Sequence, residues 1–162
     1  MEAVRLLRKA KGDPFLACDI ITGFPGEGEE DFEQTYRLCT ELDFAWIHAF
    51  PFSPRPGTDA ALLSPKVSER VAGERVVRLG LLAKSGRSAY IQRWIGEQVS
   101  AIAEASPPGL EEGHFIALTE NYLRLSIPFD RMRPRPPTGS SLQCQILSSG
   151  EECKADAYGK VL

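Results

Sequence analysis

A glycine turn between an apolar run and a block of acids is the feature that most constrains how this chain folds. The apolar run spans residues 15–22 (FLACDIIT) and lies between Pro14 and Gly23, a pattern typical of a strand that is buried on both faces of a parallel sheet. The turn GFPGEG follows, and EEDF then begins a segment with helical spacing. The three acids suit the positive end of a helix dipole and would repel an anion, so the turn is a poor phosphate site.

The elements around this turn alternate between helix and strand. Apolar residues recur at helical spacing over residues 2–11 and 29–42, and a second apolar strand, FAWIHAF, covers residues 44–50. A proline-rich loop then leads into a long helical stretch over residues 66–95. This order predicts parallel strands joined by crossover helices, which is an α/β fold.

The periodicity changes after Gly96, where apolar and polar residues begin to alternate. Leu123, Leu125 and Ile127 fall on one face of the segment YLRLSI, and SLQCQIL repeats the alternation. Proline- and glycine-rich turns separate these segments, which predicts a small antiparallel β-barrel or sandwich. We therefore expect an α/β domain over residues 1–95 and an all-β domain over residues 96–162.

Charge and hydropathy exclude several classes of protein. The net charge of the 162 residues is −3, and residues 96–162 carry 6 basic and 9 acidic side chains, so any RNA contact must come from a local patch. The N-terminus has no apolar core of the kind found in secretion signals, and no apolar run reaches the roughly 20 residues that span a bilayer. We expect a cytoplasmic protein.

The cysteines form none of the usual metal-binding motifs. The chain has four cysteines and two histidines, and no two cysteines have CxxC spacing, so a zinc site is unlikely on sequence grounds. Cys18 and Cys39 lie among apolar neighbours and are expected in the core. Cys144 and Cys153 could flank a hairpin, but a reducing cytosol argues against a disulfide between them.

Two loops follow neighbouring parallel strands and should share one rim of the sheet. The first is the glycine turn, and the second is the stiff loop PFSPRPGTD after the next strand. Such loops are either plain connections or the walls of a ligand site, because α/β folds build their sites at the carboxyl ends of parallel strands. In the β domain, TENYLRL groups an aromatic, an amide and a basic residue that could contact unpaired bases, and RMRPRPP could meet phosphates.

Three segments, taken in order, resemble one enzyme family. They are DIITGFPGEGEEDF, HAFPFSPRPGTDAA and LTENYLRL. Together they are similar to the C-terminal part of a radical S-adenosylmethionine methylthiotransferase, and the last is most similar to the branch that acts on threonylcarbamoyladenosine in tRNA. The resemblance implies the last strands of a partial parallel β/α radical SAM barrel, followed by a small OB-like TRAM barrel that binds tRNA.

The resemblance also implies cofactors that this chain alone cannot complete. Family members use one [4Fe–4S] cluster to cleave S-adenosylmethionine to a 5′-deoxyadenosyl radical, and a second cluster and a second S-adenosylmethionine to supply the methylthio group. The CxxxCxxC motif and three further cluster cysteines of the family are absent from this sequence. We therefore expect a fragment that lacks the N-terminal portion of the enzyme and is inactive by itself.

The resemblance assigns roles to residues at matching positions, none of them catalytic or metal-ligating. Two other interpretations stay open: a stand-alone RNA-binding module without catalysis, and a partner protein without an RNA role. The isopentenyladenosine branch of the family is a further alternative.

The residues assigned to the S-adenosylmethionine pocket are Gly23, Phe24, Pro25, Gly26, Glu27, Phe50, Ser53, Arg55 and Thr58. The residues assigned to tRNA are Thr119, Asn121, Tyr122 and Arg124.

Overall fold

The fold has two units, which are described separately. A computed structural model describes residues 1–150 and 155–162, and it divides into Met1–Arg87 and Ser88–Leu162. Cys153 lies outside the described residues, so the expectation about its hairpin has no structural counterpart. Within the described part of the chain, no helix combines the length and the apolar character needed to cross a bilayer.

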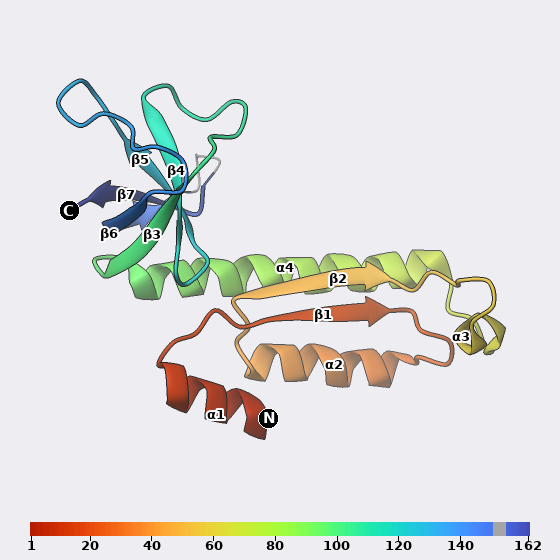
Figure 1. Ribbon diagram of the computed structural model, residues 1–162. Coiled ribbons are helices and arrows are strands. Elements are labelled where there is room, and N and C mark those ends of the chain that lie inside the picture. Colours follow the sequence, from red (N-terminus) through yellow and green to blue (C-terminus); the bar gives the residue numbers. More distant parts are fainter. Residues whose placement is uncertain (151–154) are drawn as a thin grey trace. The chain divides into compact units, whose positions relative to one another are not determined.

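The first unit alternates between helices and strands, which confirms the predicted order (Figure 1). Strands β1 and β2 pair in parallel, with Ala17 opposite Trp46 and Thr22 opposite Pro51. The last helix begins at Glu69 rather than near residue 66, and the proline-rich loop contains one short helix that the sequence did not predict. The elements are α1 (Glu2–Lys11), β1 (Ala17–Thr22), α2 (Glu29–Glu41), β2 (Trp46–Pro51), α3 (Asp59–Leu62) and α4 (Glu69–Trp94).

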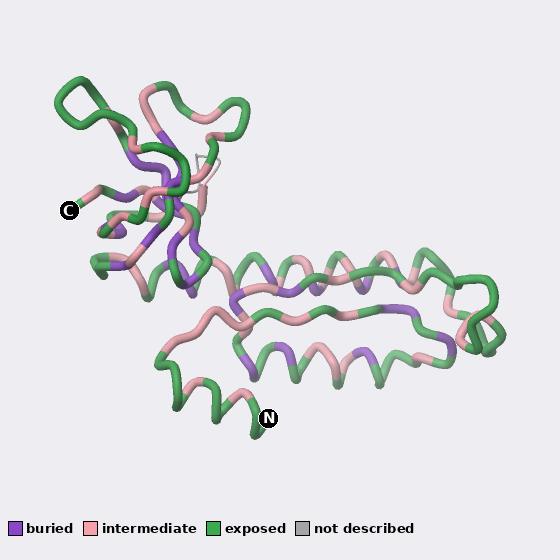
Figure 2. Tube along the Cα trace, viewed as in Figure 1, coloured by how far each residue is buried: buried purple, intermediate pink, exposed green. Residues whose placement is uncertain are grey.

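One face of this sheet is covered by helices. The buried cluster joins Phe32 and Cys39 of α2, Ile47 of β2, and Leu79 and Ala83 of α4. The other face is open, and burial along β1 alternates from residue to residue (Figure 2). The prediction that this strand is buried on both faces is therefore wrong for the described structure, because its apolar run also supplies the uncovered face.

Helix α4 packs closely against the backbone of the segment that follows α2. A Cβ atom at Gly86 would lie 2.2 Å from the carbonyl oxygen of Phe44, which no side chain could tolerate without a shift. Phe44 stands between α2 and β2 and packs against the buried cluster. Gly86 therefore lets the helix lie close against the chain segment that begins β2.

The second unit contains a closed five-stranded barrel, which is one of the two forms, barrel or sandwich, that the alternation predicted. The strand order is β3-β4-β5-β7-β6, and β6 pairs back to β3. All neighbouring strands are antiparallel except β5 and β7, which pair in parallel. The last strand, β7, completes the barrel by pairing with both β5 and β6. The strands are β3 (Gln98–Glu104), β4 (His114–Thr119), β5 (Arg124–Pro128), β6 (Ser141–Ser149) and β7 (Ala157–Val161).

Every strand contributes to the interior of the barrel. Leu123, Leu125 and Ile127 are at most 1% exposed, in agreement with the face predicted for YLRLSI. Their polar neighbours along the chain, Tyr122 and Arg124, point outward and are exposed. The other fully buried side chains of the barrel include Val99, Phe115, Ile116, Cys144 and Ile146.

Candidate functional site

The two predicted loops leave the sheet at the same edge. Thr22 and Pro51 are the last paired residues of β1 and β2, so the glycine turn and the proline loop begin side by side. A backbone hydrogen bond of 2.7 Å from Phe52 to the carbonyl of Thr22 ties the start of the proline loop to the end of β1. The carboxyl ends of parallel strands are the usual place for a site in α/β folds.

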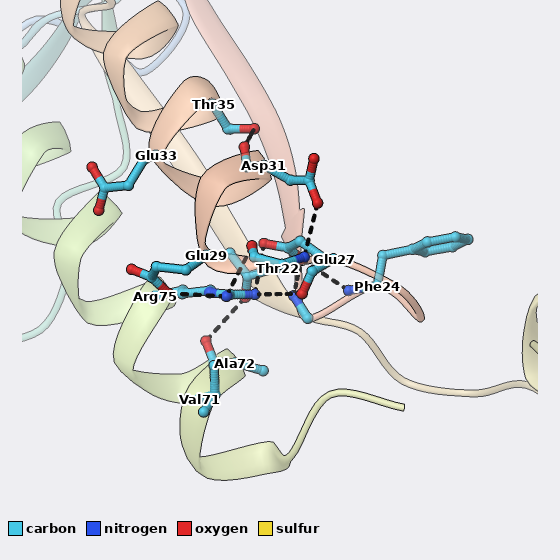
Figure 3. Close-up of polar contacts among 12 residues, drawn as sticks. Thr22, Phe24, Glu27, Glu29, Asp31, Glu33, Thr35, Val71, Ala72 and Arg75 are labelled. Carbon is cyan, nitrogen blue, oxygen red and sulfur yellow. Dashed lines mark hydrogen bonds and ion pairs between the residues drawn. The ribbon is translucent and has the colours of Figure 1, made fainter. Parts of the chain in front are cut away.

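The glycine turn lies directly on α4 (Figure 3). A Cβ atom at Gly23 would come within 2.6 Å of the Cβ of Ala72, and the φ angle of Gly23 is +73°, a region that favours glycine. The buried hydroxyl of Thr22 donates to the carbonyl oxygen of Ala72 at 3.0 Å. Gly23 and Pro25 are buried, whereas Phe24 and Gly26 reach the surface. Helix α4 thus holds the turn in place, while the side chain of Phe24 projects outward.

The side chain of Glu27 folds back onto the turn. One carboxylate oxygen accepts hydrogen bonds from the backbone N–H groups of Gly23 and Phe24, the second of them at 3.0 Å. The other oxygen lies 3.1 Å from the guanidinium of Arg75, and the side chains of Arg75 and Glu27 are only 6% and 14% exposed. Glu27, which the resemblance assigns to the cofactor pocket, therefore acts in this structure as an internal brace of the turn.

Arg75 is the residue of this site that the sequence reasoning missed. It extends from α4 and donates to the carbonyl oxygens of Glu27 and Gly28 at 3.3 and 3.1 Å. Its guanidinium also lies 3.1 Å from the carboxylate of Glu29 and 5.2 Å from the ring centroid of Phe32. Its position in the sequence could have indicated its burial, because Arg75 lies on the same helix face as the buried residues Ala72 and Leu79.

Both loops line a single pocket of about 570 Å³. Phe24 of the glycine turn meets Phe52 of the proline loop edge to face, with ring centroids 5.2 Å apart. The hydroxyl of Thr58 donates to the carbonyl of Arg55 at 2.8 Å, which closes the turn of the proline loop. The predicted residues that line this pocket are Phe24, Phe50, Ser53, Arg55 and Thr58. Gly26 and Glu27 line an adjoining pocket that shares Phe24.

An aromatic row on β2 continues from the pocket along the open face of the sheet. The rings of His48 and Phe50 are nearly parallel, with centroids 6.3 Å apart. The indole N–H of Trp46 lies 3.2 Å from the Nδ1 of His48. Because an indole nitrogen can only donate, Nδ1 accepts and the neutral imidazole carries its proton on Nε2. His48 therefore presents an N–H donor to the open face.

The TENYLR segment forms a tight turn between β4 and β5 of the barrel. Thr119 is 3% exposed, and its hydroxyl lies 2.5 Å from the amide oxygen of Asn121 and accepts from the backbone N–H of Leu123 at 2.9 Å. Asn121 is also buried, so both residues shape the turn from inside. Tyr122 has a φ angle of +61° and is 65% exposed, whereas Arg124 is exposed and pairs with Glu104 at 3.2 Å. A bulky residue with positive φ is strained, and such strain clusters at functional positions.

Comparison with known proteins supplies the context for these two regions. No family model matches the chain. The chain is 44% identical over 149 residues to the threonylcarbamoyladenosine tRNA methylthiotransferase MtaB of Treponema pallidum, a match that covers 92% of this chain and 29% of that protein. It is 40% identical over 126 residues to the protein of the same name from Bacillus subtilis, covering 76% of this chain and 28% of that protein.

The chain belongs to the tRNA methylthiotransferase family. This confirms the resemblance that the three motifs indicated. A tRNA-2-methylthio-N(6)-dimethylallyladenosine synthase from Ehrlichia chaffeensis is also related, at 36% identity over 102 residues, which cover 63% of this chain and 23% of that protein. The chain spans less than a third of the length of each of these methylthiotransferases.

The described thiols of this methylthiotransferase segment do not fit an iron–sulfur cluster. Burial raises the pKa of the Cys18 thiol to about 12 and that of Cys144 to about 11, and it also raises the pKa of Cys39. Cluster ligands are thiolates, which such buried thiols do not readily form. Over residues 1–150 and 155–162, no group of three potential ligands among His, Cys, Asp and Glu converges.

Proposed function

We propose that this chain is the part of a tRNA methylthiotransferase that builds one wall of its S-adenosylmethionine pocket and holds the tRNA. The observation that carries the proposal is that the two loops with family motifs line one pocket, in a chain 44% identical to a threonylcarbamoyladenosine tRNA methylthiotransferase. In this proposal the α/β unit is the end of a partial radical SAM barrel. The five-stranded unit is a TRAM domain of OB-like topology, a class whose strands and loops bind oligonucleotides.

The pocket chemistry suits S-adenosylmethionine. The rings of Phe24, Phe50 and Phe52 offer apolar walls to an adenine, and Arg55 offers a cation to a carboxylate. The proposed occupant supplies the methyl group and, with clusters held elsewhere in the full-length enzyme, the radical. The residues of this chain bind and orient it, because Glu27 and Arg75 fix the turn from which Phe24 projects.

The proposed reaction is addition of a methylthio group to C2 of N6-threonylcarbamoyladenosine beside the anticodon. The threonylcarbamoyladenosine branch is favoured over the dimethylallyladenosine branch because the match to its members is closer and longer, at 44% over 149 residues against 36% over 102. A tRNA-modifying role of this kind belongs in the cytoplasm. In this proposal Tyr122 and Arg124, on the surface of the barrel, contact the RNA, while Thr119 and Asn121 hold their turn.

A chimeric enzyme tests the α/β part of the proposal. This chain replaces the matching 149-residue segment of the Treponema pallidum protein, and the reconstituted chimera is assayed by mass spectrometry for the methylthio product on tRNA. We expect activity, and we expect Phe24→Ala to raise the KM for S-adenosylmethionine. Leu62→Ala is the control, because Leu62 is 83% exposed on the neighbouring helix α3 and does not line the pocket. A folded but inactive chimera beside an active parent would overturn the proposal.

Binding of RNA by the 162-residue chain tests the barrel part. We expect salt-sensitive binding of an anticodon stem–loop RNA, weakened by Tyr122→Ala through the loss of one stacking surface, which is worth about 1–3 kcal/mol per base. An equal affinity of wild type and variant would refute the role of Tyr122. Absence of salt-sensitive binding at micromolar protein would refute an RNA role for this chain.

A further inference from the structure

A second pocket lies in the barrel unit, at the end of the β4–β5 ladder away from the Tyr122 turn. Leu118 pairs with Arg124 next to that turn, whereas Phe115 pairs with Ile127 at the opposite end. Phe115 and Pro128 line this second pocket, whose volume is about 380 Å³. The two regions are therefore separated by the length of the ladder, and the proposed function uses only the first.

The walls of this pocket combine flat apolar rings with positive charge. Phe115, which is 1% exposed, lines the pocket together with three prolines. Arg133 and Lys160 supply the charge, and among residues 1–150 and 155–162 no acidic side chain lines the pocket. The lining includes Phe115, Pro128, Pro134, Pro136, Arg133 and Lys160.

This positive charge is concentrated in a domain that is otherwise acidic. Residues 96–162 carry 6 basic and 9 acidic side chains. Four of those 6 basic residues come from the loop that walls the pocket or from β7 at its edge: Arg131, Arg133, Arg135 and Lys160. Because the domain is acidic overall, any contact with RNA needs a local basic patch. These four side chains supply such a patch.

The nearest acid in the loop is committed to the loop itself. The carboxylate of Asp130 accepts hydrogen bonds from the backbone N–H groups of Met132 and Arg133, at 2.7 and 2.8 Å. These bonds, first that of Arg133 and then that of Met132, lower the pKa of Asp130. Asp130 thus holds the backbone of the loop in place beside the pocket. Glu111 and Glu112 precede β4 but are not part of the pocket lining.

We propose that this second pocket binds one unpaired nucleotide of the RNA, with the base against the proline and phenylalanine rings and a phosphate between Arg133 and Lys160. The volume is in the range of small-ligand sites, and flat apolar walls beside cations match a base joined to a phosphate. An acidic peptide would satisfy the two cations but would not need the ring-lined walls. The inference rests on the RNA-binding role proposed above and adds a second point of contact to it.

Fluorescence anisotropy with the 162-residue chain and a labelled anticodon stem–loop RNA tests this pocket. The double variant Arg133→Ala/Lys160→Ala should lose about tenfold in affinity, and the slope of log K against log salt should become shallower by about 0.7, which is the contribution of one phosphate contact to a single strand. The matched control is Arg5→Ala/Lys9→Ala, which removes the same charge from α1, where both residues are exposed. The control should bind within about twofold of wild type, because neither Arg5 nor Lys9 lines the pocket.

A pocket-filling variant separates pocket binding from simple charge attraction. Val161 lines the pocket, so Val161→Trp occupies its space without changing charge. We expect it to weaken RNA binding while thermal unfolding shows an intact barrel. Wild-type affinity in both Val161→Trp and the double variant, with Tyr122→Ala still weakened, would overturn the pocket and leave the proposed function standing. Equal displacement of the RNA by a polyglutamate peptide would overturn the nucleotide assignment.

Discussion

The two units of this chain differ in how completely they enclose their own interiors. In the barrel, each strand has a neighbour on both sides, and the strand order returns to its start. In the α/β unit, two strands are covered on one face, and Ile21 and Phe50 on the other face stay 59% and 51% exposed. The barrel therefore encloses its own core, whereas the α/β unit leaves apolar side chains on an uncovered face of its sheet.

The largest expected effect comes from the internal brace of the open unit. Arg75→Met leaves the nearly buried carboxylate of Glu27 without its cation, and breaking such a pair typically costs about 3–5 kcal/mol. We expect a loss of this size in chemical denaturation, with faster hydrogen exchange in the glycine turn. Arg78→Met is the control, because Arg78 is 42% exposed and pairs with Glu33 at the surface.

A second substitution separates the charge of this brace from its shape. Glu27→Gln keeps an oxygen that accepts from the N–H groups of Gly23 and Phe24 but removes the negative charge. Added to Arg75→Met, it should recover part of the lost stability, since no unpaired charge is left buried. A double variant less stable than Arg75→Met alone would show that the hydrogen bonds of the Glu27 carboxylate to the turn matter more than its ion pair with Arg75.

The next effect compares the two hydrophobic cores directly. Leu79 of α4 and Leu125 of β5 are both 0% exposed, and truncation of such a leucine to alanine costs about 2–5 kcal/mol. We expect Leu79→Ala to raise hydrogen exchange throughout residues 1–87, and Leu125→Ala to raise it in the barrel. If either variant destabilised both regions equally, the two units would unfold as one, and the comparison between them would lose its thermodynamic basis.

The sequence predicted the helices and strands well because each has an apolar stripe of its own period. It could not predict the open face of β1, because a nearly continuous apolar run has the same appearance whether or not anything covers it. Arg75 was missed for a related reason: its acceptors, the carbonyls of Glu27 and Gly28, are brought near only by the fold. The helix α3 contains only four residues, too few for a helical period to show.

The pocket was easier to predict than the roles of its residues. Two motif loops after neighbouring parallel strands had to meet, and Phe24, Phe50 and Arg55 do line one cavity. The burial of Thr119 and Asn121 was not predictable, because polar residues before an exposed tyrosine look the same from sequence whether they point inward or outward. Only the hydrogen bonds of Thr119 to Asn121 and Leu123 reveal that they build the turn.

A pair of glycines in α4 gives a smaller and more selective effect. A Cβ atom at Gly86 would meet the carbonyl of Phe44 at 2.2 Å, whereas one at Gly80 would meet nothing within 4 Å. Gly86→Ala should cost about 1–3 kcal/mol through overpacking. Gly80→Ala should stabilise the chain by about 0.5–1 kcal/mol, because alanine favours the helix. Thermal unfolding of both variants tests whether Gly86→Ala lowers stability and Gly80→Ala raises it. Unchanged stability of Gly86→Ala would mean that the helix can move away from Phe44.

A similarly small effect on stability is expected in the strained turn of the closed unit. Tyr122 has a φ angle of +61°, which costs about 1–2 kcal/mol for a residue other than glycine. Tyr122→Gly should therefore raise the free energy of unfolding by about 1 kcal/mol while RNA affinity falls, because glycine has no ring on which a base can stack. Tyr122→Asn serves as the control, since asparagine tolerates this conformation and also lacks the ring. Opposite signs for stability and binding would mean that the barrel keeps its strain for recognition. A loss of both stability and RNA affinity would mean that the tyrosine ring supports the barrel itself. The contrast between the closed barrel and the open α/β unit would then be weaker.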